Sequence, residues 1–243
     1  GAVGSDGLFL KEILVDAGAD VSCLRVMDTE SGCAFIEVNS KGQNRIIVSA
    51  GTNRMYTEEY IKNVLEKAEA GDFVLLQNEI NMVGEIIRLS HEKGCRVVFN
   101  ASPIPGKPEE LPLELVDIFM VNELEAAALA GTSTEGDFRD ILKALQKKYP
   151  KAAIVMTLGK EGVFYGYKEE FYSHPIFKVN AVDTTAAGDT FCGYFLAALC
   201  AEKSVETALR EASAASAMAV SAKGAAPSIP VHSAVEEWLC GRS

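Results

Sequence analysis

The chain has 243 residues, of which 48% are hydrophobic, and its formal net charge is −11. This length supports one sizeable core and is too short for two full-sized enzymatic domains. An acidic surface repels phosphate backbones, so we expect no nucleic-acid partner. The apolar runs have the length of strands rather than of membrane spans, and no signal peptide is recognisable, so no membrane partner is expected either.

Helix-like and strand-like segments alternate along the chain. The apolar spacing, caps and glycine stops predict helices over residues 5–17, 57–70, 82–93, 123–130, 138–148, 189–201, 205–222 and 235–239. Short apolar or alternating runs predict strands over residues 34–38, 45–49, 73–76, 96–99, 117–121, 153–157 and 163–166. The stretch 39–42 between the first two strands is typical of a hairpin turn.

Uniformly apolar strands that alternate with amphipathic helices indicate an α/β fold with a mainly parallel sheet covered by helices on both faces. We therefore predict one α/β domain over residues 1–243, with a small β-hairpin lid inserted at residues 33–50. Ligands of such sheets bind beyond the carboxyl ends of the strands, so polar residues and glycines that follow strands are candidate site residues.

The cysteines carry no metal-site pattern. The chain has six of them, none in a CxxC pair and none at metal-ligand spacing from a histidine. Scattered thiols in a chain of this size indicate a reducing cytoplasm, where buried cysteines act as small hydrophobic side chains.

The segment VDTTAAGDTF at residues 182–191 carries the clearest chemical pattern. Ala186, Ala187 and Gly188 lack bulk, so their backbone N–H groups can approach an anion at the start of a helix. Asp189 follows in the first turn, where a carboxylate can take a proton from an attacking hydroxyl. Positioning, charge stabilisation and such a base are what phosphoryl transfer needs. An ordinary helix start would also favour an acid at this place, but it does not require the small residues before it.

Residues 183–191 resemble the C-terminal signature of the ribokinase-like, or PfkB, carbohydrate kinases, and residues 223–230 are similar to the stretch that follows it in ribokinases. The resemblance extends over essentially the whole chain, from Val3 to Trp238. It implies the ribokinase-like fold, Asp189 as the catalytic base, and the backbone from Ala186 to Asp189 as the anion hole.

The resemblance also implies nucleotide and metal sites. Residues expected to contact ATP or to lie on its side of the site are Asn122, Thr157, Gly159, Gly162, Ser213 and Asn100. Glu125 is expected to place Mg²⁺ through water, although an acid that merely starts a helix would look the same. Residues expected to hold a K⁺ ion are Asp183, Thr185, Ala219, Ala222, Gly224 and Ser228. Ser213 stands where the family is expected to have Asn or His near the adenine.

For the sugar, the resemblance implies contacts from Glu79, Asn53 and Asp189. The family's N-terminal sugar-binding strand and its Gly-Gly motif have no counterpart, and the chain opens after them. A truncated sequence, a second polypeptide that supplies the segment, or a fragment without turnover would each explain this. Without the family's first strand, the neighbouring strand would have an unpaired edge, and such edges favour pairing between chains. This edge and the lid predict a homodimer or higher oligomer.

The function that follows is transfer of the γ-phosphate of ATP to a sugar hydroxyl, with D-ribose the leading substrate and Mg²⁺ and K⁺ as cofactors. Fructose, a nucleoside or 2-keto-3-deoxygluconate are alternative substrates, since the fold does not choose among them. A catalytically impaired homologue that only binds nucleotide or sugar is the second hypothesis. An NAD-dependent dehydrogenase would have a GxGxxG motif after an early strand, which this sequence lacks.

Overall fold

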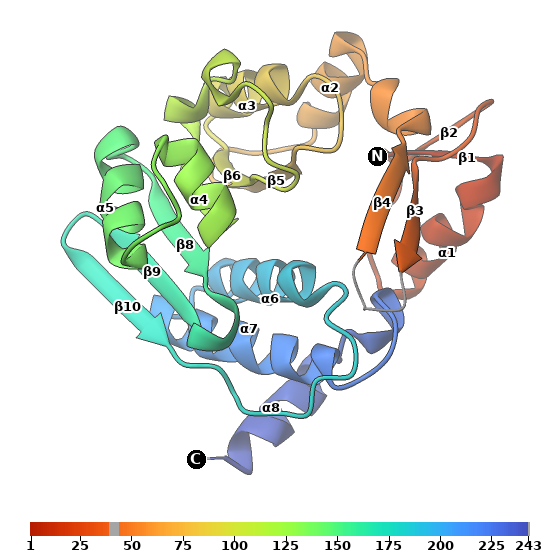
Figure 1. Cartoon of the computed structure of the whole chain (residues 1–243). Helices are drawn as coiled ribbons and strands as arrows, with labels where there is room; N and C mark the ends of the chain where they lie inside the picture. The colour runs from red at the N-terminus through yellow and green to blue at the C-terminus, as the bar shows by residue number, and fades with distance from the viewer. Residues whose placement is uncertain (39–43, 243) are drawn as a thin grey trace. The chain divides into compact units, whose positions relative to one another are not determined.

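The computed structural model describes residues 1–38 and 44–242, and the described chain forms two compact units, residues 1–116 and 117–243. The predicted hairpin turn at residues 39–42 lies outside the described residues. Figure 1 colours the chain from the N-terminus to the C-terminus and labels its elements.

The strands described in the first unit form three pairs. Strand β1 (Ala2–Gly4) pairs in parallel with β2 (Arg25–Met27), and β3 (Cys33–Val38) pairs antiparallel with β4 (Asn44–Ser49). Strand β5 (Phe73–Gln77) pairs in parallel with β6 (Arg96–Asn100), with Phe73 opposite Arg96. The strands β3 and β4 confirm the two predicted strands of the hairpin, whereas the β1–β2 pair was not predicted from the sequence.

The helices of the first unit are short. They are α1 (Leu8–Asp16), α2 (Glu58–Leu65) and α3 (Val83–Glu92), with 3-10 turns at Ser5–Gly7, Gly51–Arg54, Pro108–Glu110 and Leu113–Leu115. Thr57 caps α2 by accepting the N–H of Tyr60 at 3.2 Å, and such a cap stabilises a helix by about 1 kcal/mol.

The prediction that this second helix continues to Ala70 is wrong, because α2 ends at Leu65. The N–H of Ala68 bonds to the carbonyl of Leu65, three residues back, so the chain tightens and leaves the helix. Gly71, at a φ of +95°, then donates its N–H to the carbonyl of Gly94.

The second unit contains four neighbouring strands. Strand β7 (Ile118–Asn122) pairs in parallel with β8 (Ala153–Thr157), and β8 pairs antiparallel with β9 (Val163–Tyr167). Strand β10 (Glu170–His174), which the sequence analysis missed, pairs antiparallel with β9 and places Glu170 opposite Tyr167. The buried strands β7 and β8 have the uniformly apolar composition expected for strands covered on both faces.

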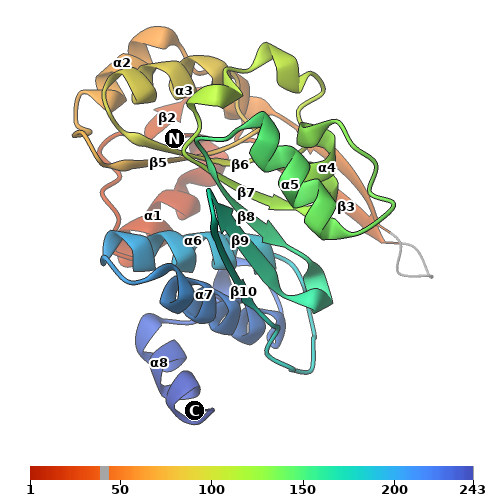
Figure 2. The same ribbon diagram turned by 90° about the vertical axis from the view of Figure 1, so that its left-hand side faces the viewer.

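Helices cover both faces of these strands. In Figure 2, α4 (Glu123–Ala130) and α5 (Phe138–Lys148) lie on one side of β8–β10, and α6 (Ala187–Cys200) and α7 (Val205–Val220) lie on the other. Helix α8 (His232–Cys240) packs on α7, where Val235 and Leu239 meet Ala214 and Ala215. The predicted α/β architecture is therefore confirmed.

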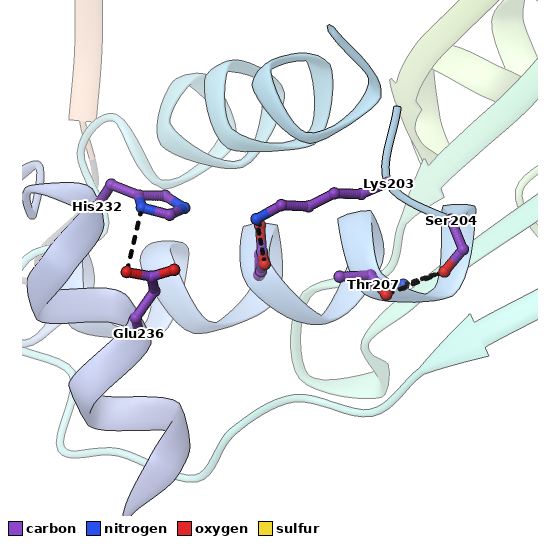
Figure 3. A network of polar contacts seen from close by, with 6 residues as sticks. Lys203, Ser204, Thr207, His232 and Glu236 are labelled. Carbon is purple, nitrogen blue, oxygen red and sulfur yellow. Dashed lines mark hydrogen bonds and ion pairs between the residues drawn. The ribbon is translucent and has the colours of Figure 1, made fainter. Parts of the chain in front are cut away.

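Helices α6 and α7 pack closely along each other. Helix α7 buries a series of alanines, including Ala208, Ala212, Ala215 and Ala219, and small side chains allow two helix backbones to approach. The tight turn between the two helices is fastened by Lys203, whose ammonium group lies 2.7 Å from Glu211 on α7 (Figure 3).

Candidate active site

A cavity of about 580 Å³ lies in the second unit at the start of α6. Its walls are the β8–β9 turn, the segment that follows β10, the first turn of α6 and one face of α7. Six of the residues singled out from the sequence line it: Thr157, Gly159, Gly162, Ala187, Gly188 and Ser213. A volume of this size is typical of a small-molecule site.

The first turn of α6 exposes Gly188 and Asp189, while the Ala187 N–H bonds to the carbonyl of Thr184 at 3.3 Å. Ala186 precedes the helix at a φ of +58°, and its own methyl side chain offers no cap to this helix end. A Cβ atom added to Gly188 would meet no atom within 4 Å, so open space lies in front of this residue. Because the first N–H groups of a helix lack partners within the helix and lie at its positive end, this turn suits a phosphate-like anion.

Asp189 lies in the same first turn, one residue after Gly188, and it is exposed. It does not belong to the lining of the cavity, although Gly188 and Phe191 on either side of it do. A carboxylate in this place would lie next to an anion bound at the helix end and could accept a proton from a second, incoming group.

The loop before α6 is fastened by Asp183. One carboxylate oxygen accepts the Thr185 hydroxyl at 2.6 Å and the Thr185 N–H at 3.0 Å, and the other accepts the Gly224 N–H at 3.0 Å. These hydrogen bonds, those from Thr185 first, lower the pKa of Asp183 to about 2, so the group is ionised at neutral pH.

The end of α7 lies against the same loop. The carbonyl of Val220 accepts the N–H of Val182 at 2.7 Å, and the Ser228 hydroxyl donates to the carbonyl of Ala225 at 2.8 Å. Of the predicted cation ligands, Asp183, Thr185 and Gly224 are thus directly linked, while Ala219 and Ala222 follow along the end of α7. An ionised carboxylate with hydroxyl and carbonyl oxygens nearby fits a hard cation.

Asn122 and Glu125 form a capping box at the start of α4. The Asn122 side chain accepts the Glu125 N–H at 2.9 Å, and Glu125 accepts the Asn122 N–H at 2.9 Å. Burial is the main cause that raises the pKa of Glu125 above its usual range. One oxygen of this carboxylate keeps acceptor capacity, so the residue fits a water-mediated contact to a metal ion besides its structural role.

No group of three or more His, Cys, Asp or Glu side chains that could hold a metal ion is found among residues 1–38 and 44–242. Likewise, no helix in this described part of the chain is long and apolar enough to cross a membrane.

The β8–β9 turn brings backbone to the cavity. Gly159 and Gly162 adopt φ angles of +49° and +97°, and a Cβ atom on Gly162 would lie 2.2 Å from the carbonyl oxygen of His174. Only glycine fits there, because the turn packs directly against the end of β10. Thr157 stands at the end of β8, and Asn100, which ends β6 in the first unit, is buried and accepts the N–H of Ser102.

Of the three predicted sugar contacts, Asn53 and Glu79 lie near each other in the first unit, and Asp189 lies in the second. Asn53 belongs to the 3-10 turn after β4, and its carbonyl accepts the N–H of Asn81 at 3.0 Å. Asn81 closes the turn that carries Glu79, which is exposed just beyond the end of β5.

Sequence reasoning missed several residues that line the cavity. Lys160 lies inside the glycine turn that the sequence had already singled out, so its position could have been noticed. Phe177 and Lys178 follow β10, a strand that was not predicted, and no sequence pattern marked them. Ser216 lies one helical turn after Ser213 and donates to the carbonyl of Ala187 at 3.1 Å.

An α/β fold with a cavity that reaches the start of a helix, beside an acid, fits a protein that binds phosphoryl groups. The pattern of the pfkB family carbohydrate kinases matches residues 1–232. The chain belongs to this family, and the predicted family membership is confirmed.

Relatives of known function cover nearly the whole chain. A ribokinase of Haemophilus influenzae is 34% identical over 98% of this chain and 79% of its own length. A ribokinase of Staphylococcus aureus is 34% identical over 97% of this chain and 79% of its own length.

Solved structures agree with the fold. The crystal structure of a Thermotoga maritima ribokinase matches with a TM-score of 0.84 at 33% identity, over 98% of this chain and 80% of that one. The Arabidopsis thaliana ribokinase complexed with ribose and ATP matches with a TM-score of 0.84 at 31% identity, with the same coverage of 98% and 80%. The predicted ribokinase-like fold is therefore confirmed.

Proposed function

We propose that this chain is an ATP-dependent kinase that transfers the γ-phosphate of ATP to the primary hydroxyl of D-ribose and forms ribose 5-phosphate. The observation that carries this proposal is the cavity that ends at the uncapped start of α6, directly before Asp189. The family, and relatives named ribokinase at 34% identity, support a sugar as the acceptor.

In the proposed reaction, Asp189 accepts the proton of the ribose hydroxyl. The hydroxyl oxygen forms a bond to the γ-phosphorus, the bond from that phosphorus to the β,γ-bridging oxygen breaks, and ADP leaves with the electron pair. The N–H groups at the start of α6, from Ala187 to Asp189, hold the negative charge on the phosphoryl oxygens as it redistributes.

The nucleotide is proposed to occupy the cavity, where Thr157, Gly159, Gly162 and Ser213 line its walls. Asn122 supports the same side of the site from the start of α4, and the sugar is held by Glu79 and Asn53. These assignments rest on the family resemblance and on the neighbourhoods described above.

Two cations complete the proposal. Mg²⁺ would be held through water by Glu125 and would neutralise charge on the ATP phosphates. K⁺ would be held by oxygen atoms of Asp183, Thr185, Ala219, Ala222, Gly224 and Ser228. The low pKa of Asp183 supports this, because its carboxylate keeps a negative charge in the loop before α6.

We also propose that the protein works in the cytoplasm as a homodimer. All six cysteines are free thiols, which fits a reducing compartment. The hairpin exposes Phe35, Ile47 and Val48, with 61%, 49% and 69% of their surface accessible, and apolar strands of this kind favour pairing between chains. Light scattering at micromolar concentration should give twice the chain mass, and a single-chain mass would exclude the dimer.

The test of the reaction is identification of its product. The protein is incubated with ATP, Mg²⁺, K⁺ and one sugar of a panel that contains D-ribose, fructose, a nucleoside and 2-keto-3-deoxygluconate, and the products are separated by mass spectrometry. We expect a phosphorylated pentose with ribose and little product with the others. A product from another sugar alone would replace ribose as the substrate, and nucleotide binding with no product from any sugar would favour a binding protein without turnover.

A further inference from the structure

The cavity beside α6 has a charge that contrasts with the rest of the protein. The chain has 34 acidic and 23 basic side chains, yet the charged side chains found in the described lining of the cavity are two lysines, Lys160 and Lys178. The lining is therefore positive in a protein whose net charge is −11. A positive cavity on an acidic protein concentrates small anions locally.

The two lysines come from different elements of the wall that faces α6 and α7. Lys160 lies in the 3-10 turn Gly159–Glu161 between β8 and β9, and Lys178 lies in the segment that follows β10. Gly162 packs against the carbonyl of His174, so the turn that carries Lys160 is fastened to the end of β10, four residues before Lys178. The fold thus presents both lysines to one cavity.

Neither lysine is held by an acidic side chain within residues 1–38 and 44–242. The ion pairs of this part of the chain use other cations, including Lys62, Lys107 and Lys203. Both lysines are exposed, so their ammonium groups remain available for an anion that enters the cavity.

The rest of the lining combines apolar side chains with the backbone at the start of α6. Val163, Phe177, Val179 and Phe191 supply apolar surface, which suits a flat heterocyclic base. Gly188 lines the cavity from the start of α6, where the terminal phosphate is proposed to sit. In a bound nucleoside triphosphate, the phosphates between the heterocyclic base and the start of α6 would carry negative charge that the helix end alone does not neutralise.

We propose that Lys160 and Lys178, from the β8–β9 turn and the segment after β10, bind the phosphate chain of the nucleotide donor, and that they make the site select nucleoside polyphosphates over nucleosides. This inference rests on the proposed function only in that the nucleotide occupies this cavity. Neither lysine takes part in the chemical step, so both are binding residues.

The test compares charge-removing variants with a matched control. Lys160→Gln, Lys178→Gln and the double variant keep most of the side-chain length, and Lys147→Gln removes an exposed charge at the end of α5, away from the cavity. Binding of ATP, adenosine and inorganic tripolyphosphate is measured by isothermal titration calorimetry with the full chain at low and at moderate salt. Thermal unfolding verifies that each variant is folded.

We expect each lysine variant to weaken ATP and tripolyphosphate binding by about three- to tenfold, which is typical for loss of a charge-assisted contact at a partly exposed site. Adenosine binding should stay unchanged, and the salt dependence of ATP binding should fall in the double variant. Lys147→Gln should match the unmodified protein for all three ligands.

Equal ATP affinity in the unmodified protein and the double variant would overturn the inference, as would an equal loss for adenosine and ATP. These outcomes are separable from failure of the proposed function. A protein that binds ATP through the lysines but phosphorylates no sugar would keep the inference and exclude the ribose kinase. A protein that phosphorylates ribose, but whose lysine variants bind ATP as tightly as the unmodified protein does, would keep the ribose kinase and exclude the inference.

Discussion

Asp189 is the residue on which the proposed chemistry depends. It occupies the first turn of α6, where an acid also stabilises an ordinary helix through the helix dipole. The two roles predict different effects of removing the carboxylate. Turnover stops if Asp189 is the base, whereas only stability falls if it merely interacts with the helix dipole.

We predict that Asp189→Asn lowers kcat by at least about a hundredfold, the usual contribution of a general base, and leaves ATP affinity nearly intact. Ribose-dependent ADP release gives kcat, and calorimetry gives the affinity. Glu206→Gln, which changes an exposed acid in the first turn of α7, is the control and should keep full activity. A parallel loss of kcat and ATP affinity in Asp189→Asn would argue against the base assignment.

Asp183 predicts a dependence of stability on pH. Its pKa is lowered from 3.8 to about 2 in the folded protein, so the folded state binds its proton more weakly than the unfolded state does. The stabilisation is therefore complete above about pH 4 and is lost as the pH falls towards 2.

The measurement is urea unfolding of the unmodified protein and Asp183→Asn between pH 7 and pH 2.5. We expect a constant difference in the free energy of unfolding at the upper end of this range and a shrinking one below about pH 4. Asp183→Asn should also weaken activation by K⁺. A difference in stability that grows as the pH falls would contradict the assigned hydrogen bonds.

At the scale of elements, the start of α4 combines a structural and a proposed functional role. Glutamine can replace glutamate in a capping box, so Glu125→Gln should keep the reciprocal hydrogen bonds with Asn122 and remove only the charge. We predict a change in the free energy of unfolding below about 0.5 kcal/mol and a higher Mg²⁺ concentration for half-maximal activity.

The comparison variant is Asn122→Ala, which loses the cap and should cost about 1 kcal/mol of stability. If Glu125→Gln leaves the Mg²⁺ requirement unchanged, the glutamate has only its capping role.

The turn between α6 and α7 depends on an ion pair that is largely shielded from solvent. The side chains of Lys203 and Glu211 are 30% and 13% exposed, and Lys203 contacts both carboxylate oxygens. Figure 3 shows Lys203 beside Ser204, the residue whose hydroxyl accepts the Thr207 N–H and caps α7, with His232 and Glu236 on α8 further along.

Because this pair lies between the exposed and the buried cases, we predict a coupling energy of about 1 to 3 kcal/mol in a double-mutant cycle of Lys203→Ala and Glu211→Ala. Urea unfolding supplies the free energies. Additive effects of the two substitutions would show that the pair contributes nothing beyond its separate side chains.

Several helices and buried strands of the second unit could be predicted from the sequence residue by residue. Helices α4 and α5 and strand β8 have the predicted bounds, because caps, glycine or proline stops and apolar runs agree there. Strand β10 was missed because its sequence, EFYSH, is short and mostly exposed, and it forms only by pairing with β9.

In the first unit, β1 and β2 were missed because three residues each are too few to show a strand pattern. At the site, the small residues and the acid of residues 186–189 could be found because their pattern is local in sequence. Lys178 could not, since it reaches the cavity only through the path of the chain after β10.

At the scale of the whole molecule, the chain is a member of the pfkB family of carbohydrate kinases whose relatives of known function match it over almost all of its length. Its second unit contains the cavity proposed for the nucleotide, the start of α6 and Asp189, while Glu79 and Asn53 belong to the first unit.

The most direct test of the account is ADP release by the full chain with ATP, Mg²⁺ and K⁺, measured with and without D-ribose. We predict release that depends on ribose and that is absent in Asp189→Asn. ADP release that is the same with and without ribose, or no release by a protein that still binds ATP, would contradict the assignment of a ribose kinase.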